Sequence, residues 1–159
     1  MAANKKMTRE DVEREMERAQ RTDEQSMTIE PGQATPSFTD IHPNLDQAYL
    51  RGVDLSGLDL TDASLRYGDL RGAILEGTVL AGADLTHANL TDTMRTEGAD
   101  LSGVTLYLAH LEGADLIRTR LEPALPDFLK NATYSDDTCW PVGFDPSVYG
   151  ARRVGRIGG

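Results

Sequence analysis

The sequence predicts a solenoid, a rod built from one short repeat that turns a corner in every unit, with a non-repetitive segment at each end. Two observations predict this fold. Leucines stand five residues apart from Leu45 to Leu90 and again from Leu101 to Leu121. In addition, all 19 leucines of the 159-residue chain lie between Leu45 and Leu129. The periodic span therefore forms the core, and the leucine-free ends are appendages to it.

A period of five residues fits neither regular element. On an α-helix, steps of five residues turn through about 500°, so the leucines would wind around every face. On a strand they would alternate between the two faces. A five-residue unit must instead bend once per repeat. Glycine, which tolerates unusual dihedral angles, stands two residues after many of the leucines, and a small side chain stands two residues before them.

The repeats resemble a known family. The clearest units are Gly82-Ala-Asp-Leu-Thr, His87-Ala-Asn-Leu-Thr, Gly98-Ala-Asp-Leu-Ser and Gly113-Ala-Asp-Leu-Ile. They resemble the pentapeptide-repeat family, whose pattern is A-(D/N)-L-X-X, over about residues 43–123. The resemblance implies an all-β solenoid, a right-handed quadrilateral β-helix of about four coils, with the leucine and the small residue facing inward. At about 4.8 Å between stacked strands, this rod would be about 20 Å long.

Residues 1–42 are predicted to form a polar N-terminal arm, with a helix over about residues 8–22 followed by an extended linker. The helix has a suitable N-cap in Thr8 and a thin apolar stripe among many charges. The stripe consists of Val12, Met16 and Ala19. Because so polar a helix is poorly suited to hold itself against the rod, it is either a solvated arm or a docking arm that orders on a partner. The expected plugs of the N-terminal end are Phe38, Ile41 and Pro43.

Residues 124–159 are predicted to be a C-terminal cap followed by a basic tail. The pattern breaks at two prolines after Leu121, and the segment 132–146 resembles the ending of many pentapeptide-repeat proteins, where it closes the last coil. The cap residues would be Tyr134, Trp140 and Phe144, and the basic tail carries Arg152, Arg153 and Arg156. The rival interpretation of the aromatic residues is a ligand pocket, but no polar constellation accompanies them.

Catalysis has little support in the sequence, so we expect a non-enzyme without cofactor or metal. The three histidines (His42, His87 and His110) have no cysteine or acid at metal-ligand spacing. No nucleophile-elbow, phosphate-binding-loop or dinucleotide motif is found. Cys139 is expected to be a small residue of the cap rather than a nucleophile. The recurring aspartates could suggest calcium, but they occupy the position that the family pattern fills with Asp or Asn.

Composition restricts the partners and the compartment. The chain has 26 acidic and 16 basic residues, a net charge of −10, which argues against direct nucleic-acid binding. The sequence contains no run of about 18 apolar residues, so no membrane span is predicted. The N-terminus also lacks the apolar stretch of a signal peptide. The sequence therefore predicts a cytoplasmic protein, or one held within a viral or other large assembly, without membrane contact.

Two groups of outward-facing apolar side chains are candidate interfaces, either for a partner protein or for a homo-oligomer. The first group is Tyr67, His87, Tyr107 and Leu108, and the second is Ile74, Val79 and Met94. Scattered apolar surface residues, which are common in monomers, are the alternative. Arg95 falls in the longer gap between Leu90 and Leu101, and we expect a bulge there that projects its charge into solvent.

Three functions are compatible with these features. The first is a structural and interaction protein whose arms tie the rod to neighbouring subunits, as in a shell or virion-type lattice. The second follows from the resemblance, because some pentapeptide-repeat proteins mimic DNA, bind type II topoisomerases and confer quinolone resistance. The repeat region, with 13 acids and 6 bases and a net charge of −7, suits that idea, but it lacks phenylalanine at its centres. The third is an accessory that binds a small molecule or a metal.

Overall fold

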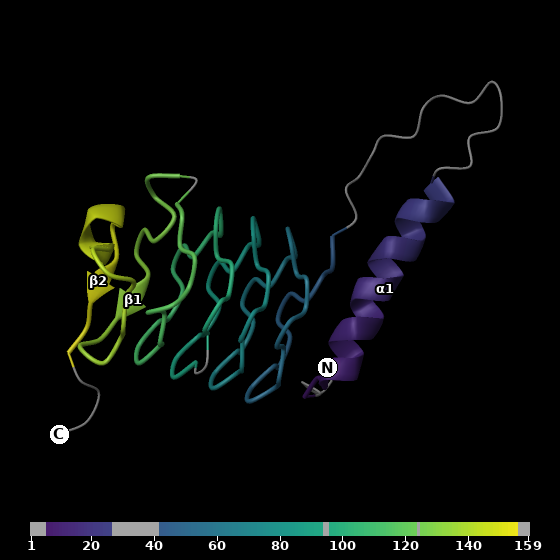
Figure 1. The fold of residues 1–159 in the computed structure, drawn as a ribbon, viewed down its shortest axis with the longest axis horizontal. Coiled ribbons are helices and arrows are strands. Elements are labelled where there is room, and N and C mark those ends of the chain that lie inside the picture. The colour runs from purple at the N-terminus through teal and green to yellow at the C-terminus, as the bar shows by residue number, and fades with distance from the viewer. Residues whose placement is uncertain (1–5, 27–41, 94–95, 124, 156–159) are drawn as a thin grey trace.

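The computed structural model describes residues 6–26, 42–93, 96–123 and 125–155 (Figure 1). These residues form a rod of stacked coils. Helix α1 (Arg9–Ser26) lies across one end of the rod, and strands β1 (Thr133–Tyr134) and β2 (Arg152–Arg153) lie at the other. Four regular columns of backbone β-bridges run along the rod.

The coils have four sides. Parallel β-bridges join Asn44 to Ser64 and Ser64 to Asp84, so one coil takes 20 residues in this part of the chain. Equivalent columns of bridges begin at Tyr49, Asp54 and Asp59, which places one repeat on each side. Each side contributes a single bridging residue between two turns. For this reason few of the described residues are assigned to strands, although the coils are joined by backbone hydrogen bonds throughout.

The interior is a stack of leucines, and this confirms the predicted solenoid. Every in-frame leucine from Leu45 to Leu116 is at most 2% exposed. Burial of each such side chain stabilises the fold by roughly 1.5–3 kcal/mol. The same residues join successive coils, because the Leu60 amide donates to the Val79 carbonyl at 2.7 Å and the equivalent bond recurs from coil to coil. The small residue two positions earlier fills the remaining space, as Ala63 and Ala83 do at 0% exposure.

The longer gap in the leucine series lengthens one coil by a residue. Val79 bridges Asp100, 21 residues further on, whereas the preceding bridges span 20. Thr96 takes the inward position of the missing leucine, since the Ala99 amide donates to its carbonyl as the Thr78 amide does to the Leu75 carbonyl. Its hydroxyl group donates to the Asp115 carbonyl, so the buried polar atom is satisfied. The bulge expected at Arg95 lies outside the described residues.

Helix α1 begins with a reciprocal capping arrangement. The Thr8 hydroxyl accepts from the Asp11 amide at 3.2 Å, and the Asp11 carboxylate accepts from the Thr8 amide at 2.8 Å. These bonds satisfy two backbone donors at the start of the helix. The helix runs to Ser26, past the residue 22 at which the sequence predicts its end.

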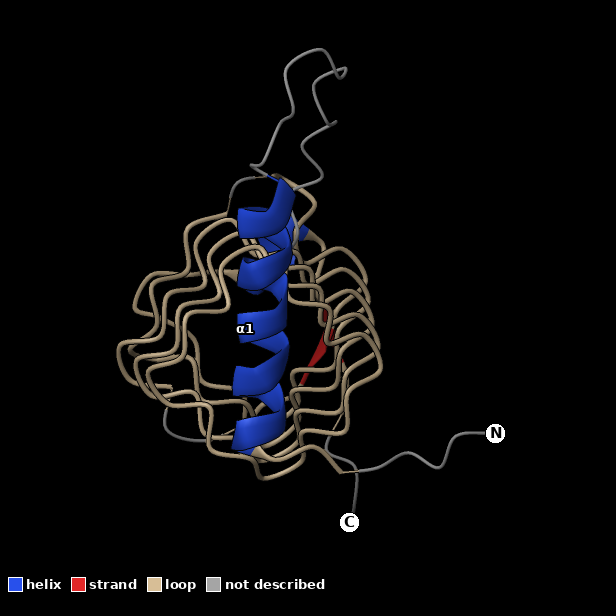
Figure 2. Cartoon of the chain, turned by 90° about the vertical axis from the view of Figure 1, so that its right-hand side faces the viewer, coloured by secondary structure: helices blue, strands red, loops and turns tan. Residues whose placement is uncertain are grey.

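The apolar stripe of α1 packs on the chain's own solenoid. Val12 is fully buried and Ala19 is 7% exposed, and Met16 is packed against the leucine core. Figure 2 shows α1 lying across the open end of the coils. The prediction that Val12, Met16 and Ala19 dock on a partner is therefore wrong, because these apolar side chains cover the N-terminal end of the chain's own solenoid. Two of the plugs expected there, Phe38 and Ile41, lie outside the described residues.

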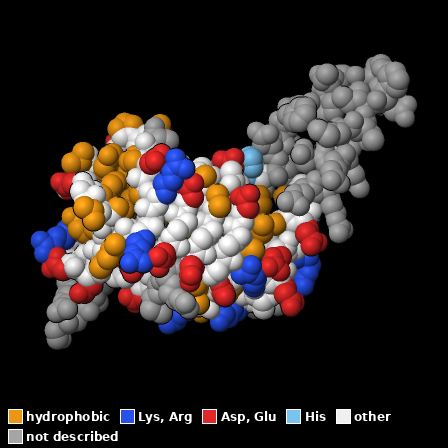
Figure 3. All heavy atoms as spheres, in the orientation of Figure 1, with side chains coloured by type: hydrophobic (Ala, Val, Ile, Leu, Met, Phe, Trp, Pro, Cys, Tyr) orange, Lys and Arg blue, Asp and Glu red, His pale blue; other side chains and the backbone are white. Residues whose placement is uncertain are grey.

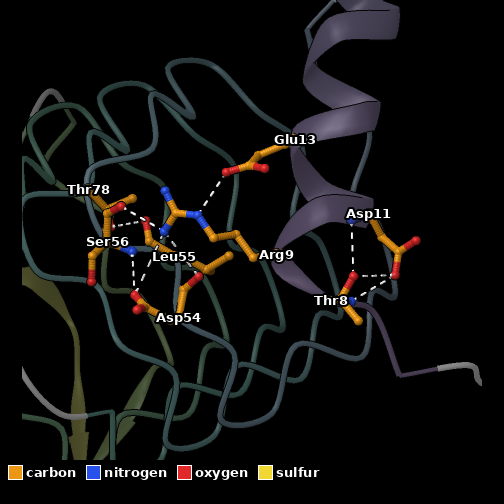
Figure 4. A network of polar contacts seen from close by, with 8 residues as sticks. All are labelled: Thr8, Arg9, Asp11, Glu13, Asp54, Leu55, Ser56 and Thr78. Carbon is orange, nitrogen blue, oxygen red and sulfur yellow. Dashed lines mark hydrogen bonds and ion pairs between the residues drawn. The ribbon is translucent and has the colours of Figure 1, made fainter.

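Polar contacts also hold α1 against the N-terminal end of the coils (Figure 4). The Arg9 guanidinium donates to the Ser56 carbonyl at 2.9 Å and to the Asp54 carbonyl at 3.4 Å, and Glu13 accepts from its Nε at 2.8 Å. The backbone ahead of α1 joins the coils as well. Lys6 bridges Tyr49, and the Met7 amide donates to the Tyr49 carbonyl at 2.9 Å. A helix that looks too polar to dock is thus held by hydrogen bonds as well as by its apolar stripe.

An aromatic cluster packs at the C-terminal end of the core. Phe128 is 2% exposed, and its ring centroid lies 5.1 Å from that of Tyr149. Phe144 stacks on Tyr149 at 5.2 Å and on Trp140 at 5.3 Å, and Tyr134 meets Trp140 edge-on at 5.7 Å. A short 3-10 helix, Pro146–Tyr149, presents Tyr149 to this cluster. Figure 3 shows hydrophobic side chains gathered toward this end of the rod.

Candidate functional site

One corner of the solenoid carries larger side chains on every described rung where the other corners mostly carry glycine. In most repeats, the residue two positions after the leucine has a positive φ and is a glycine. At one corner the same position is occupied by larger residues, stacked rung upon rung. We call this column the glycine-free corner. It consists of Gln47, Tyr67, His87, Leu108 and Asn131, whose φ angles lie between 57° and 61°.

Backbone hydrogen bonds show that these five residues form one column. The Tyr67 amide donates to the Thr86 carbonyl at 2.9 Å, and the His87 amide donates to the Tyr107 carbonyl at 2.9 Å. The Leu108 amide continues the series with the Lys130 carbonyl at 3.1 Å. Tyr107 stands immediately beside the column, so the first predicted group of interface residues does gather at one place.

The side chains of the corner form an exposed aromatic surface. The rings of Tyr67 and His87 are stacked with centroids 4.6 Å apart and planes 10° from parallel. The Arg66 guanidinium lies 5.9 Å from the centroid of the Tyr67 ring, a cation–π distance. Tyr67 is 53% exposed and Tyr107 is 36% exposed, and both rings can therefore contact another molecule.

A shallow depression adjoins Tyr67. It has a volume of about 580 Å³ and is lined by Gln47, Tyr49, Tyr67, Asp69 and Arg71. Arg71 donates to both carboxylate oxygens of Asp69, at 2.8 Å and 2.6 Å. This bidentate hydrogen bond holds the pKa of Asp69 below its ordinary value and raises that of Arg71. The depression therefore offers two tyrosine rings and a fixed ion pair of both signs.

Of the second predicted group of interface residues, the structure describes Ile74 and Val79. Ile74 belongs to the bridge column of Asp54, and Val79 belongs to that of Asp59 and Asp100. The two half-buried side chains thus lie on different sides of the rod, each with carboxylates on neighbouring rungs. Met94, the third member of the group, and the neighbouring Arg95 lie outside the described residues. Because Met94 is not among the described residues, the apolar interface at this group stays a prediction, with Asp54 on the rung next to Ile74 and Asp59 and Asp100 on those next to Val79.

The recurring aspartates have a structural role. The Asp54 carboxylate accepts from the Ser56 amide at 2.9 Å, and Asp84 accepts from the Thr86 amide at 2.9 Å. Each carboxylate thus holds the turn that follows it, which explains why Asp or Asn fits this position. Among the described residues, no three His, Cys, Asp or Glu side chains are grouped so as to hold a metal ion.

The residues predicted for the C-terminal cap and the basic tail lie in three places. Tyr134, Trp140 and Phe144 lie in the aromatic cluster and pack against the core. Arg152 and Arg153 form the strand β2, with both side chains exposed, while Arg156 lies outside the described residues. Within the part of the chain that the structure describes, no helix has the length and apolar character needed to cross a bilayer.

The sequence predicts that Tyr67, His87, Tyr107 and Leu108 share one face, but the absence of glycine from this corner was overlooked. Its members are spaced 20, 20 and 21 residues apart from Gln47 to Leu108, which is the length of one coil. The residue types two positions after the leucines, compared from coil to coil, indicate that this corner lacks glycine. On the other corners of the described repeats, Asp62 and Asp92 are the non-glycine residues with a positive φ at equivalent positions, and each is stacked beside a glycine, Gly82 or Gly113.

Comparison with known proteins supports the interpretation of the repeats. The family model described as Pentapeptide repeats matches residues 44–82, 69–94 and 96–122, with eight copies of its unit. A comparison with curated protein sequences gives no significant match.

Several solved structures are similar to the chain. One is a pentapeptide repeat protein from the Arabidopsis thaliana thylakoid lumen, with 25% identity and a TM-score of 0.45, and the alignment covers 68% of this chain and 59% of that one. Another is the pentapeptide repeat protein Rfr23 from the cyanobacterium Cyanothece 51142, with 28% identity, a TM-score of 0.33 and coverage of 67% and 69%. QnrB1, a plasmid-mediated fluoroquinolone resistance protein, gives 15% identity, a TM-score of 0.36 and coverage of 58% and 57%.

Proposed function

Because the chain belongs to the pentapeptide-repeat family, we propose that it is a non-catalytic scaffold that binds a partner protein through the glycine-free corner. Proteins of this family are generally structural or interaction proteins. The four-sided solenoid supplies a rigid frame, and the corner supplies the contact surface. The exposed aromatic surface replaces the helix as the candidate attachment point to a larger assembly such as a shell or lattice.

Backbone strain at the corner is the observation that carries this proposal. A residue other than glycine in the left-handed region is disfavoured by roughly 1–2 kcal/mol. Tyr67, His87 and Leu108 all adopt this conformation on successive coils, whereas the left-handed positions of the other corners are mostly glycines, with Asp62 and Asp92 as single exceptions. Strained positions of this kind are concentrated at functional sites, because a role for the side chain offsets the loss of stability.

The chemistry of the corner suits a protein interface. Tyrosine and arginine are enriched where proteins contact each other, since they combine a large apolar area with a polar group. Tyr67, Tyr107 and Arg66 provide these groups on neighbouring rungs of a rigid backbone. Little side-chain freedom would be lost on binding, because Tyr67 is already stacked on His87.

A site-specific cross-linking experiment tests the proposal. The photoreactive residue p-benzoylphenylalanine would replace Tyr67, Tyr107 or Ile117 in the full-length protein, in cells that make it. Ile117 is the matched control, because it is 48% exposed and lies in another column of the rod. We expect the same protein to be cross-linked from positions 67 and 107 and not from position 117. Equal capture at all three positions, or none at any, would contradict the proposal.

Substitutions then measure the contribution of the corner with that purified partner. Tyr67→Asn keeps a residue that tolerates the left-handed conformation, so the fold should be retained while the ring is lost. We expect Tyr67→Asn combined with Tyr107→Ser to weaken binding at least tenfold. Ile117→Ser should leave the affinity unchanged. An unchanged affinity in the double variant would place the interface elsewhere.

A second candidate function is a DNA-mimicking inhibitor or protector of a type II topoisomerase. The observation in its favour is the outward position of the acids, because Asp59, Asp84 and Asp100 all lie in the bridge columns of the rod. Many of these charges are already engaged, as Asp84 is by Arg66 at 3.8 Å and Asp100 by Arg120 at 3.5 Å. A supercoiling assay with added protein separates the two functions, since no effect at micromolar concentration would rule out the mimic.

A further inference from the structure

The two ends of the solenoid are closed in different ways. At the N-terminal end, the outermost rung of the Tyr49 column is covered, because Lys6 bridges Tyr49 and α1 lies over the coil. The same column runs through His110 and Thr133 and ends at Arg152 in β2. No described residue pairs with β2 on its outer side, since the sheet there contains β1 and β2 alone. The C-terminal end therefore has a covered core but an open strand edge.

The backbone of β2 presents unused hydrogen-bonding groups on that edge. The Arg152 amide donates to the Ala132 carbonyl at 2.7 Å, and the Val154 amide donates to the Tyr134 carbonyl at 2.8 Å. Because backbone groups alternate along a strand, the N–H and C=O of Arg153, which stands between them, point away from β1. An open edge of this kind accepts an additional strand.

The side chains of β2 give the edge a positive charge on an acidic protein. Both arginines are exposed, and the chain as a whole has a net charge of −10. Arg153 forms an ion pair with Asp136, whereas no ion pair of Arg152 is found within the described residues. The outward residue of an added strand would lie about 4.8 Å from Arg152. A carboxylate at that distance would pair with it, and a cation would be repelled.

We propose that β2 is the docking edge for an extended acidic segment of a partner protein, which adds to the solenoid as its next parallel rung. Charge argues against a second copy of this chain as the occupant. Head-to-tail stacking of two copies would pair β2 of one copy with the Tyr49 edge of the other, but Lys6 already pairs with that edge. Lys6 is also a cation and would repel the arginines of β2. Pairing of two β2 strands would bring four arginines together. This site is separate from the glycine-free corner, so it stands independently of the function proposed above.

A peptide-binding experiment with the full-length protein tests the edge. The probe is a fluorescein-labelled, end-blocked peptide, Thr-Val-Glu-Val-Glu-Val-Thr, and its counterpart has lysine in place of glutamate. We expect fluorescence anisotropy to show at least tenfold tighter binding of the glutamate peptide. Arg152→Glu should reverse this preference. Equal binding of the two peptides to the native chain would overturn the proposal.

A pair of variants separates the backbone contact from the charge. Arg153→Pro removes the outward N–H but leaves the two bonds from Arg152 and Val154 to the neighbouring rung intact. Arg153→Thr is its matched control, because it loses the same charge and the same ion pair but keeps the N–H. We expect the proline variant to bind the glutamate peptide at least tenfold more weakly than the threonine variant. Equal binding by the two variants would show attraction by charge alone and would refute strand addition.

Hydrogen exchange locates the bound peptide. The glutamate peptide should slow exchange of the Arg153 amide in the native chain and leave the Met7 amide unchanged. Protection of the Val154 amide in Arg153→Pro, equal to that in the native chain, shows that β2 remains paired with β1. Slowing at α1 or at the glycine-free corner instead of β2 would place the peptide elsewhere and contradict the proposal.

Discussion

Replacing Val12 by alanine tests whether α1 is part of the folded solenoid. Val12 is fully buried between α1 and the first coil. The change removes two methyl groups from a closed interface, so the lost transfer free energy and the resulting cavity together amount to about 2 kcal/mol. Val12→Asp should be worse, because it places a carboxylate without a partner in the same apolar space.

Urea unfolding followed by circular dichroism measures this effect. We expect Val12→Ala to lower the free energy of unfolding by about 2 kcal/mol, with an unchanged dependence on urea. Arg14→Ala is the control on the same helix, because Arg14 is exposed and its ion pair with Asp11 should contribute less than about 0.5 kcal/mol. If Val12→Ala and Arg14→Ala were equally stable, α1 would not be seated on the coils, and the account of the N-terminal end would be refuted.

Three further changes test other parts of the structure. Phe128→Ala should lower the free energy of unfolding by about 3–5 kcal/mol in the same assay, because Phe128 is 2% exposed and joins the aromatic cluster to the core. Gly82→Ala should cost about 1–2 kcal/mol from its φ of 72° alone, and the new methyl group must also displace the Asp62 carboxylate. The pKa of Asp69 is lowered by its hydrogen bond from Arg71, so that bond stabilises the fold above the ordinary pKa of 3.8 and is lost as the pH falls below it. Urea midpoints measured from pH 7 to pH 3 should therefore decline less steeply for Asp69→Asn than for the native chain.

The course of the solenoid could be predicted from the sequence because the repeat records the packing directly. A leucine every fifth residue allows one inward position per side, and the buried leucines from Leu45 to Leu116 occupy it. The interior of the longer coil could be anticipated only in part. Thr96 can replace an inward leucine because its hydroxyl group donates a hydrogen bond to the Asp115 carbonyl. A pattern of hydrophobic residues does not predict a buried threonine of this kind.

The docking of α1 could not be predicted, because its main polar contact joins residues far apart in the chain. Arg9 counts as a solvent-facing charge in a helical pattern, yet it donates to the carbonyl groups of Asp54 and Ser56. The aromatic surface was partly predictable, since Tyr67 and His87 are separated by one coil. What the sequence analysis lacked was the positive φ of these residues, which distinguishes a strained corner from scattered apolar side chains.

The central claim is that this chain covers the leucine core at both ends of its own solenoid and presents an aromatic corner to a partner. Amide hydrogen exchange of the isolated full-length protein tests it most directly. The Met7 amide, bonded to the Tyr49 carbonyl at 2.9 Å, and the Arg152 amide, bonded to the Ala132 carbonyl at 2.7 Å, report on the two ends. We predict that both are protected from exchange in the absence of any partner, as the Leu85 amide is in mid-rod. Exchange of Met7 and Arg152 at the rate of an unfolded chain, with Leu85 still protected, would contradict the account.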